Sequence, residues 1–169
     1  MDDDEIDCLV PDQALDSDPG STIYCRLLTE MMQISSEVRK RLGTPRALKQ
    51  TPEQLFDIVH DLTKKLNDLK DYASQQYRFT LDRPLDTFRL PEVGLTLRQA
   101  QSLQSHYFCL VLDINTPLTY PWSGLRLRVE QSASALAHIE ISCKAVAQIS
   151  RSAILATRHI HIDASCPAM

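Results

Sequence analysis

The sequence predicts an all-α fold, an irregular bundle of about four main helices with a long ordered loop. Apolar residues recur at spacings of three and four, capping residues stand where such stretches begin, and the 4 glycines fall at boundaries between stretches. At 169 residues, the chain has the length of one domain. We expect an acidic, flexible arm over residues 1–20, a helical domain over 21–156 and an irregular tail over 157–169.

The first helix is expected to begin at Ser21 or Thr22, since either hydroxyl can cap a helix N-terminus, and to stop at Gly43. The basic run at 39–41 suits the negative end of the helix dipole. The apolar stripe of this helix consists of Ile23, Leu27, Met31, Ile34, Val38 and Leu42.

The second helix is expected over about 51–73. Thr51 can cap it, Pro52 suits the first helical position, and Gln54 completes a capping box. Its apolar stripe consists of Leu55, Val59, Leu62, Leu66, Leu69 and Ala73. Its charged residues lie off that stripe and predict a solvated face, on which Asp61 and Lys65 stand at i, i+4 spacing.

The stretch from 74 to 94 has no helical period and is interrupted by two prolines and a glycine. It nevertheless carries many large apolar side chains, so we expect this long loop to lie across the helices. These side chains are Tyr77, Phe79, Leu81, Leu85, Phe88 and Leu90.

The third helix is expected from Leu97, capped by Thr96, to Asp113 or Ile114. The run YFCLVL at 107–112 leaves almost no polar face, which is typical of a helix buried nearly all round. We expect 115–117 to end the helix, because the residue before a proline is pushed out of the α region, and the turn to Trp122 to pin the chain across the bundle. The inward residues are expected to be Leu97, Ala100, Leu103, Tyr107, Leu110 or Val111, and Ile114.

Residues 124–129 alternate apolar and basic side chains, and we interpret them as the irregular start of a fourth helix that becomes clear from Ser132. Many alanines keep that helix slim, which allows close packing. Its predicted stripe consists of Ala133, Leu136, Ile139, Cys143, Val146 and Ile149 or Ser150.

The net charge of -4 is unevenly distributed. Residues 1–25 hold eight of the 22 acidic residues and none of the 18 basic ones, so an interaction tail is the alternative to a simple solvated arm. Basic residues cluster only at 39–41, which argues against a nucleic-acid surface. No stretch is long and apolar enough to span a membrane, and the acidic start is unlike a signal peptide, so we expect an intracellular protein.

The sequence predicts no catalytic, cofactor or metal site. It has no phosphate-binding glycine loop and no nucleophile motif. His159 and His161 have a metal-like spacing but no third ligand nearby, and the remaining histidines and the paired carboxylates of the second helix lack a reason to be activated. The odd number of cysteines, without close pairs, predicts buried free thiols at Cys8, Cys25, Cys109, Cys143 and Cys166.

The order of several segments resembles the regulatory middle region of fungal zinc binuclear cluster transcription factors. The segments are DDDEIDCLVPDQ at the N-terminus, CRLLTEMMQISSEVRKRL, YRFTLDRPL, LRQAQSLQSHYFCLVLDINTPLTYPW and SCKAVAQISRSAI. The matching positions are Ile6, Asp7, Leu9, Pro11, Leu103, His106, Tyr107, Asn115, Pro117, Pro121, Trp122, Ser142, Cys143, Ala145 and Ala147. The resemblance spans about residues 2–155.

This resemblance implies an all-helical, non-enzymatic regulatory domain of a nuclear transcription factor. Its partners would be proteins of the transcription machinery or a second copy of the chain, and DNA would be contacted only through a zinc-binding module absent here. The six-cysteine zinc array of the family has no counterpart in this sequence, so we expect a fragment, with apolar surface around the third helix partly exposed. The alternatives are a free-standing helical adaptor and a small helical enzyme with its site on the 74–94 loop.

Overall fold

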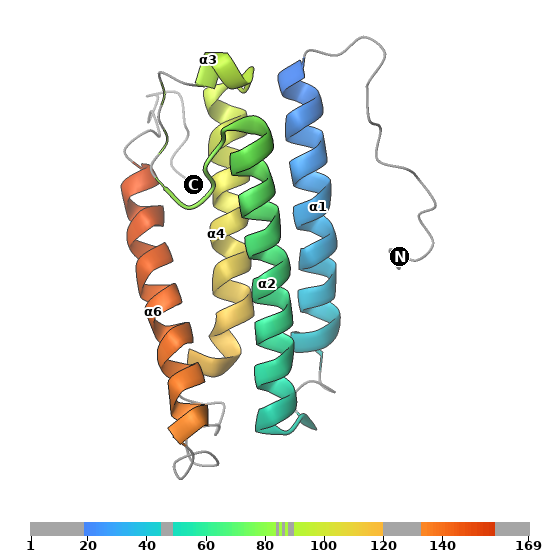
Figure 1. Cartoon of the computed structure of the whole chain (residues 1–169), viewed down its shortest axis with the longest axis vertical. Helices are drawn as coiled ribbons and strands as arrows, with labels where there is room; N and C mark the ends of the chain where they lie inside the picture. The colour runs from blue at the N-terminus through green and yellow to red at the C-terminus, as the bar shows by residue number, and fades with distance from the viewer. Residues whose placement is uncertain are drawn as a thin grey trace, which may run out of the picture.

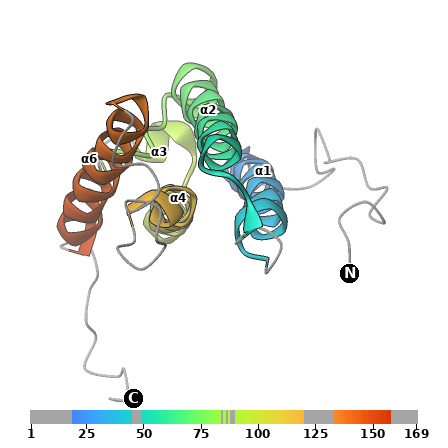
Figure 2. The ribbon, with the colours of Figure 1, turned by 90° about the horizontal axis from the view of Figure 1, so that it is seen from below.

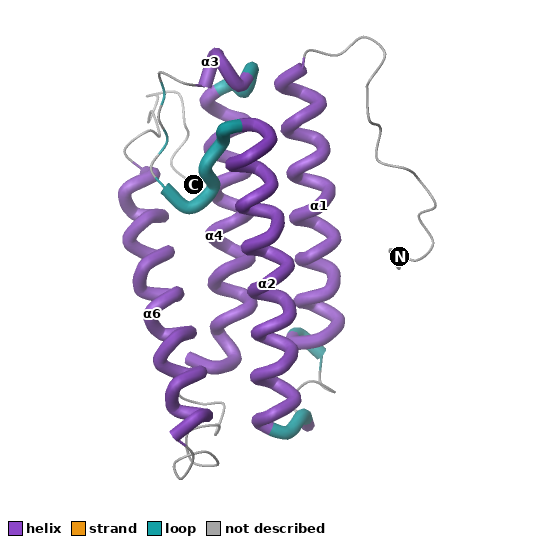
Figure 3. Tube along the Cα trace, viewed as in Figure 1, coloured by secondary structure: helices purple, strands orange, loops and turns teal. Residues whose placement is uncertain are grey.

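The computed structural model of the chain describes residues 19–44, 49–83, 85, 87, 90–119 and 133–157. Throughout these residues the regular structure is helical, and the predicted all-α class is confirmed (Figure 3). The helices are α1 (Pro19–Leu42), α2 (Pro52–Tyr77), the single turn α3 (Leu90–Val93), α4 (Leu97–Thr119) and α6 (Ala133–Ala156). The stretch 124–129 and the turn to Trp122 lie outside the described residues.

The four long helices lie side by side and alternate in direction along the chain (Figure 1). Seen end-on, α4 has α6 on one side, α1 on the other and α2 across a third side (Figure 2). The bundle is therefore organised around α4, which contacts each of the other three long helices. Within the described part of the chain, no helix covers the fourth side of α4.

Helix α1 begins at Pro19, two residues before the predicted caps, so Ser21 and Thr22 lie in its first turn. Proline is well suited to a first helical position because it lacks the N–H that would be left unpaired there. In the first turn of α1, Gly20 is buried and packs closely against Gly94. A Cβ added to Gly94 would lie 3.3 Å from the Gly20 nitrogen. Gly43 ends α1 as predicted, with its N–H bonded to the Arg39 carbonyl at 3.1 Å.

Helix α2 begins with the predicted capping box. The Thr51 hydroxyl accepts a bond from the Gln54 N–H, and the Gln54 side chain accepts one from the Thr51 N–H. The predicted end at residue 73 is wrong, because α2 continues to Tyr77 and is closed by Arg78 in the left-handed conformation. The Tyr77 ring packs edge-on against Tyr72, and their hydroxyls are 3.1 Å apart, so contact between aromatic rings extends the helix where the apolar period stops.

The segment between α2 and α4 lies across the helices, as its apolar residues predict. Phe79, Leu81, Leu85 and Leu90 are all buried in the common core, while Phe88 lies outside the described residues. Gln104 of α4 holds the segment in place, since its amide donates to the carbonyls of Thr80 and Arg83. The segment also contains the single turn α3, which the loss of helical period did not predict.

Helix α4 is the main point at which sequence and structure differ. Its predicted start is correct, because Thr96 and Gln99 form a reciprocal cap. Its predicted end is wrong, because the helix continues through Pro117 to Thr119. Burial of Leu118 accounts for the continuation of the helix. Leu118 is buried one turn after Ile114, and a helix that ended at residue 114 would not bring Leu118 into the core. The proline does not break the helix but leaves it without one main-chain hydrogen bond in its last turns.

We predict that Pro117→Ala stabilises the protein. The substitution restores an N–H that can bond the Asp113 carbonyl and removes the ring clash, which together are worth up to about 3 kcal/mol. Thermal unfolding followed by circular dichroism should show a higher midpoint than for the wild type. An unchanged or lower midpoint would contradict this prediction and mean that Pro117 does not destabilise α4.

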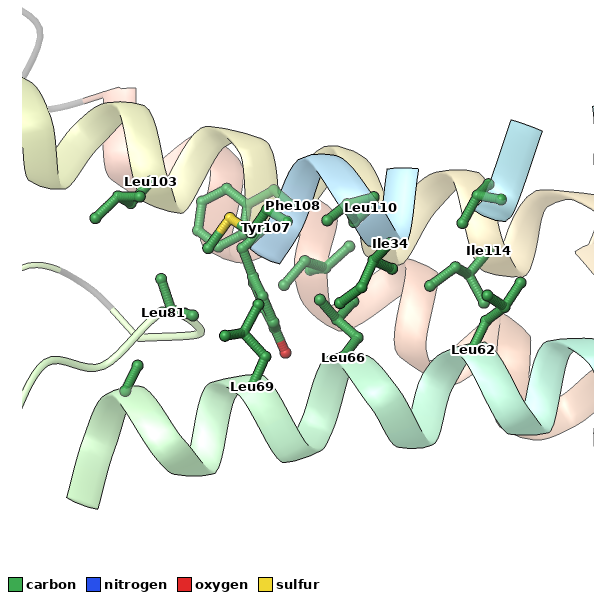
Figure 4. Close-up of a cluster of buried hydrophobic side chains, with 14 of the residues drawn as sticks. Ile34, Leu62, Leu66, Leu69, Leu81, Leu103, Tyr107, Phe108, Leu110 and Ile114 are labelled. Atoms are coloured by element: carbon green, nitrogen blue, oxygen red, sulfur yellow. The ribbon is translucent and has the colours of Figure 1, made fainter. Parts of the chain in front are cut away.

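The core is a continuous apolar cluster between α4, α2 and α1 (Figure 4). Leu62, Leu81, Leu103 and Ile114 are fully buried in it. Tyr107 extends from α4 toward α2 and ends beside Leu69, which places a phenol inside an apolar layer. Burial raises the pKa of Tyr107 to about 12, because the charged phenolate would lose its hydration there.

We predict an alkaline limit on stability that depends on Tyr107. The raised pKa means that the stabilisation is fully present below pH ~10 and is lost as the pH rises toward about 12. In Tyr107→Phe the free energy of unfolding should fall less between these pH values, by on the order of 2 kcal/mol. Urea titrations at pH 7 and pH 11 should show roughly half of this difference, because pH 11 lies midway between the two pKa values. Tyr77→Phe should reduce the alkaline loss in the same way, since burial also raises the pKa of the half-buried Tyr77 to about 12.

Candidate interaction surface on α6

Two of the histidines considered as candidate site residues, His106 and His138, make contacts within the bundle. His106 of α4 pairs through Nδ1 with the Ser102 carbonyl one turn earlier, at 2.8 Å. His138 of α6 stacks on Phe56 of α2, with ring centroids 4.9 Å apart. His60 lies exposed on the outer face of α2, and His159 and His161 lie outside the described residues.

The carboxylates of α2 lie on its solvated face, as predicted. Asp57, Asp68 and Asp71 are exposed. Asp61 bonds to Arg41 of α1, a closer partner than the predicted Lys65, which lies 4.0 Å away. The hydrogen bond from Arg41 lowers the pKa of Asp61. Lys65 in turn pairs with Glu37 of α1 at 2.7 Å, so this charged cluster joins α1 to α2.

The prediction of buried thiols is wrong for the three cysteines in the described residues. Cys25, Cys109 and Cys143 are all exposed and unpaired. The packing of the bundle, which the sequence does not show, decides their exposure. Among the described residues, no three His, Cys, Asp or Glu side chains are placed to hold a metal ion, and no helix is long and apolar enough to cross a membrane.

The 74–94 loop was considered as an alternative enzyme site. Its described apolar side chains lie in the core. A hollow of about 530 Å³ lies at its two ends, between α1, the end of α2 and α3. Its polar lining includes Tyr77, Arg78 and Glu92. The raised pKa of Tyr77 keeps its phenol protonated at neutral pH, so this group is not a ready base.

The face of α6 that packs on the bundle matches the predicted stripe only in part. Ile139 and Ile149 of that stripe are buried, whereas Leu136 and Cys143 are exposed, and Ala135 and Ser142 are buried as well. The small side chains on the buried face allow two helix backbones to approach closely. Apolar residues occur all round this helix, so their spacing alone could not select the buried face.

Four large apolar side chains of α6 are exposed, and they are the main feature of the molecular surface. Leu136 is 46% exposed, Ile141 64%, Ile154 69% and Leu155 38%. Apolar surface was expected around the third helix, but the exposed positions of α4 carry small or polar residues such as Ser105, Cys109 and Thr116. Among the described residues, the exposed large apolar side chains therefore lie on α6, with the exception of Met32 of α1, which is 40% exposed. The prediction assigned no function to it, although Ile141, Ile154 and Leu155 fall off the predicted stripe and indicated a second apolar face.

The exposed residues of α6 form two separate faces. Leu136, Cys143, Ala147 and Ile154 are seven, four and seven residues apart, a spacing that aligns them along one side of a helix; we call them the α6 stripe. Ile141 and Leu155 lie on the outer side of the helix, and we call them the outer pair.

A shallow groove of about 280 Å³ separates α4 from α6. Phe108, Cys109 and Leu112 line it from α4, and Ala153 and Ala156 line it from α6, so its walls are mostly apolar. Gln104 forms part of one wall, and its buried Oε1 has no hydrogen-bond partner among the residues that the structure describes.

Charged residues accompany the α6 stripe. Glu140 pairs through one carboxylate oxygen with Lys144, at 2.7 Å, and hydrogen bonding from Lys144 lowers the pKa of Glu140. Arg151 lies exposed further along the same helix. An apolar row bordered by charges of both signs is the usual composition of a protein-interaction surface.

Comparison with known protein families, with curated proteins and with solved structures finds no match to this chain.

We predict that charges are tolerated on the exposed residues of α6 and not on its buried ones. Ile154→Glu and Ile141→Glu should change the free energy of unfolding by no more than about 0.5 kcal/mol, because both side chains already face water. Ile139→Glu should unfold or strongly destabilise the protein, because Ile139 is 4% exposed and a carboxylate there would be buried unpaired. Urea titration monitored by circular dichroism tests this; a large loss for Ile154→Glu would contradict the assignment of the exposed face.

Proposed function

We propose that this chain is a non-catalytic helical interaction domain that acts in transcription regulation, with α6 as its docking helix. The observation that carries the proposal is the exposure of four large apolar side chains on one helix of an otherwise well-packed bundle. Exposed apolar residues are ordinary when they are scattered singly, but several on one helix favour a binding surface. Burying them against a partner would gain about 25 cal/mol for each Å² of apolar area removed from water.

The transcriptional part of the proposal is supported by the resemblance to the regulatory region of fungal zinc binuclear cluster factors. That resemblance implies a nuclear protein in which a separate zinc-containing module binds DNA, while the helical region receives protein partners. An all-α fold is what the resemblance leads one to expect. On this proposal the chain needs no cofactor of its own.

The second candidate is a free-standing helical adaptor, which the exposed apolar side chains of α6 suit equally well. An adaptor would use the same α6 surface, so the surface does not separate the two functions. The coding sequence on either side does: a transcription factor requires a six-cysteine zinc cluster upstream, whereas an adaptor has its own start and stop signals.

The experiment that tests the proposal joins the full chain to a heterologous DNA-binding domain and measures a reporter gene in a fungal host. We expect a several-fold change in reporter expression, in either direction, that Leu136→Glu with Ile154→Glu or Ile141→Glu with Leu155→Glu removes. Asn67→Glu, on the exposed side of α2, is the matched control because it adds a like charge away from α6.

Protein levels and circular dichroism must be equal among these variants, so that a lost effect reports the surface and not the fold. A tethered chain that leaves the reporter unchanged, or whose effect survives both α6 double variants, would contradict the proposal.

A further inference from the structure

The α6 stripe has a spacing that reads the same in both directions along the helix. Leu136 and Ile154 each lie nine residues from position 145, and Cys143 and Ala147 each lie two residues from it. Large side chains thus stand at both ends of the stripe, and small ones stand at its centre. A surface with this symmetry is complementary to itself under a two-fold axis that reverses the helix direction.

We propose that the occupant of the α6 stripe is a second copy of this chain, held through an antiparallel α6–α6 pair centred on Ala145. This inference rests on the proposed function, because it names the partner that would dock on the same helix, α6. In this pair Leu136 lies against Ile154 of the second copy, and Cys143 lies against Ala147 of the second copy. The small residues at the centre allow the two helix axes to approach, while the large ones at the ends are removed from water.

The charges next to the stripe specify the antiparallel direction. Glu140 lies five residues before position 145 and Arg151 lies six residues after it, and both project from the same edge of the stripe. An antiparallel pair therefore brings Glu140 beside Arg151 of the second copy, twice. Glu140 has the capacity for this contact, because Lys144 engages only its Oε1 atom. A parallel pair would instead place the two Glu140–Arg151 edges on opposite flanks of the interface, so Glu140 would not meet Arg151 of the second copy.

The outer pair does not offer the same arrangement. Ile141 and Leu155 are centred on Gln148, and an antiparallel pair through them would bring Lys144 beside Arg151 of the second copy. These two positive charges would repel each other, so the charges favour pairing through the α6 stripe over pairing through the outer pair. The two faces of one helix therefore provide a test surface and a control surface with closely similar exposed apolar residues.

The expected dimer is of moderate strength. Stable interfaces remove about 1,200–2,000 Å² of surface from water, and a single pair of helices of this length covers less. We expect a dissociation constant in the micromolar range, and a dimer that is largely formed at about 100 µM protein.

Sedimentation equilibrium of the full chain tests the proposal, with the monomer mass of 19.1 kDa as reference. The wild type should approach twice this mass with rising concentration. Glu140→Arg and Arg151→Glu should each raise the dissociation constant at least tenfold, because each places like charges together at both ends of the pair. The double variant carrying both changes should associate like the wild type, and an equimolar mixture of the two single variants should form heterodimers.

The apolar contact is tested by Ile154→Glu, with Ile141→Glu as its matched control. The first should abolish the dimer and the second should leave it intact, since these two isoleucines are 69% and 64% exposed but lie on different faces. A wild-type chain that stays monomeric at about 100 µM overturns the proposal. It is equally overturned if the double charge variant fails to associate, or if Ile141→Glu disrupts the dimer as strongly as Ile154→Glu does.

The sedimentation and reporter experiments together distinguish a failure of the dimer from a failure of the proposed function. A monomeric chain whose reporter effect still depends on α6 would overturn the dimer alone, leaving another protein as the occupant of α6. A dimer whose tethered form leaves the reporter unchanged would overturn the transcriptional role alone.

Discussion

The structure depends on the burial of α4 among three other helices. Leu103 and Ile114 of α4 are fully shielded from water, and α1, α2 and α6 each pack against a different side of this helix. Removing one such leucine-sized side chain from water is worth about 1.5–3 kcal/mol, and α4 contributes several of them. Helix α2 adds to this arrangement, because it contacts α1, α4 and α6 as well.

A few polar side chains determine how the elements meet within this apolar core. Gln104, Asn115 and Ser142 are the buried polar residues of the described chain. Gln104 fixes the segment after α2 onto α4 through two carbonyl groups, and Asn115 donates to the Val111 carbonyl within its own helix. Ser142 stands where a larger residue would separate α6 from α4. These groups specify contacts, while the apolar residues supply most of the driving force.

Helix α6 uses its two sides differently. Ile139 and Ile149 face the bundle together with the small residues Ala135 and Ser142, while four other large apolar residues are left facing water. The helix therefore carries apolar side chains on both its buried and its exposed sides, unlike the usual amphipathic pattern. A helix of this composition is stable in the bundle and still has apolar surface available to a partner. The two-fold symmetry of the α6 stripe and the positions of Glu140 and Arg151 make a second copy the partner that fits best.

The sequence by itself determined the all-α class, the capping box at Thr51, the cap at Thr96, the stop at Gly43 and the stripes of α1 and α2, because these depend on neighbours within one or two turns. It also indicated that the segment containing Phe79 and Leu81 is buried. Only the tertiary structure decided that α4 continues through Pro117, that α2 reaches Tyr77, and that Leu136 and Cys143 of α6 face water. The physical reason is that helix packing selects among apolar faces that look alike in sequence: burial of Leu118 outweighs the bond lost at the proline, and packing against the bundle selects the side of α6 that carries Ile139 and Ile149.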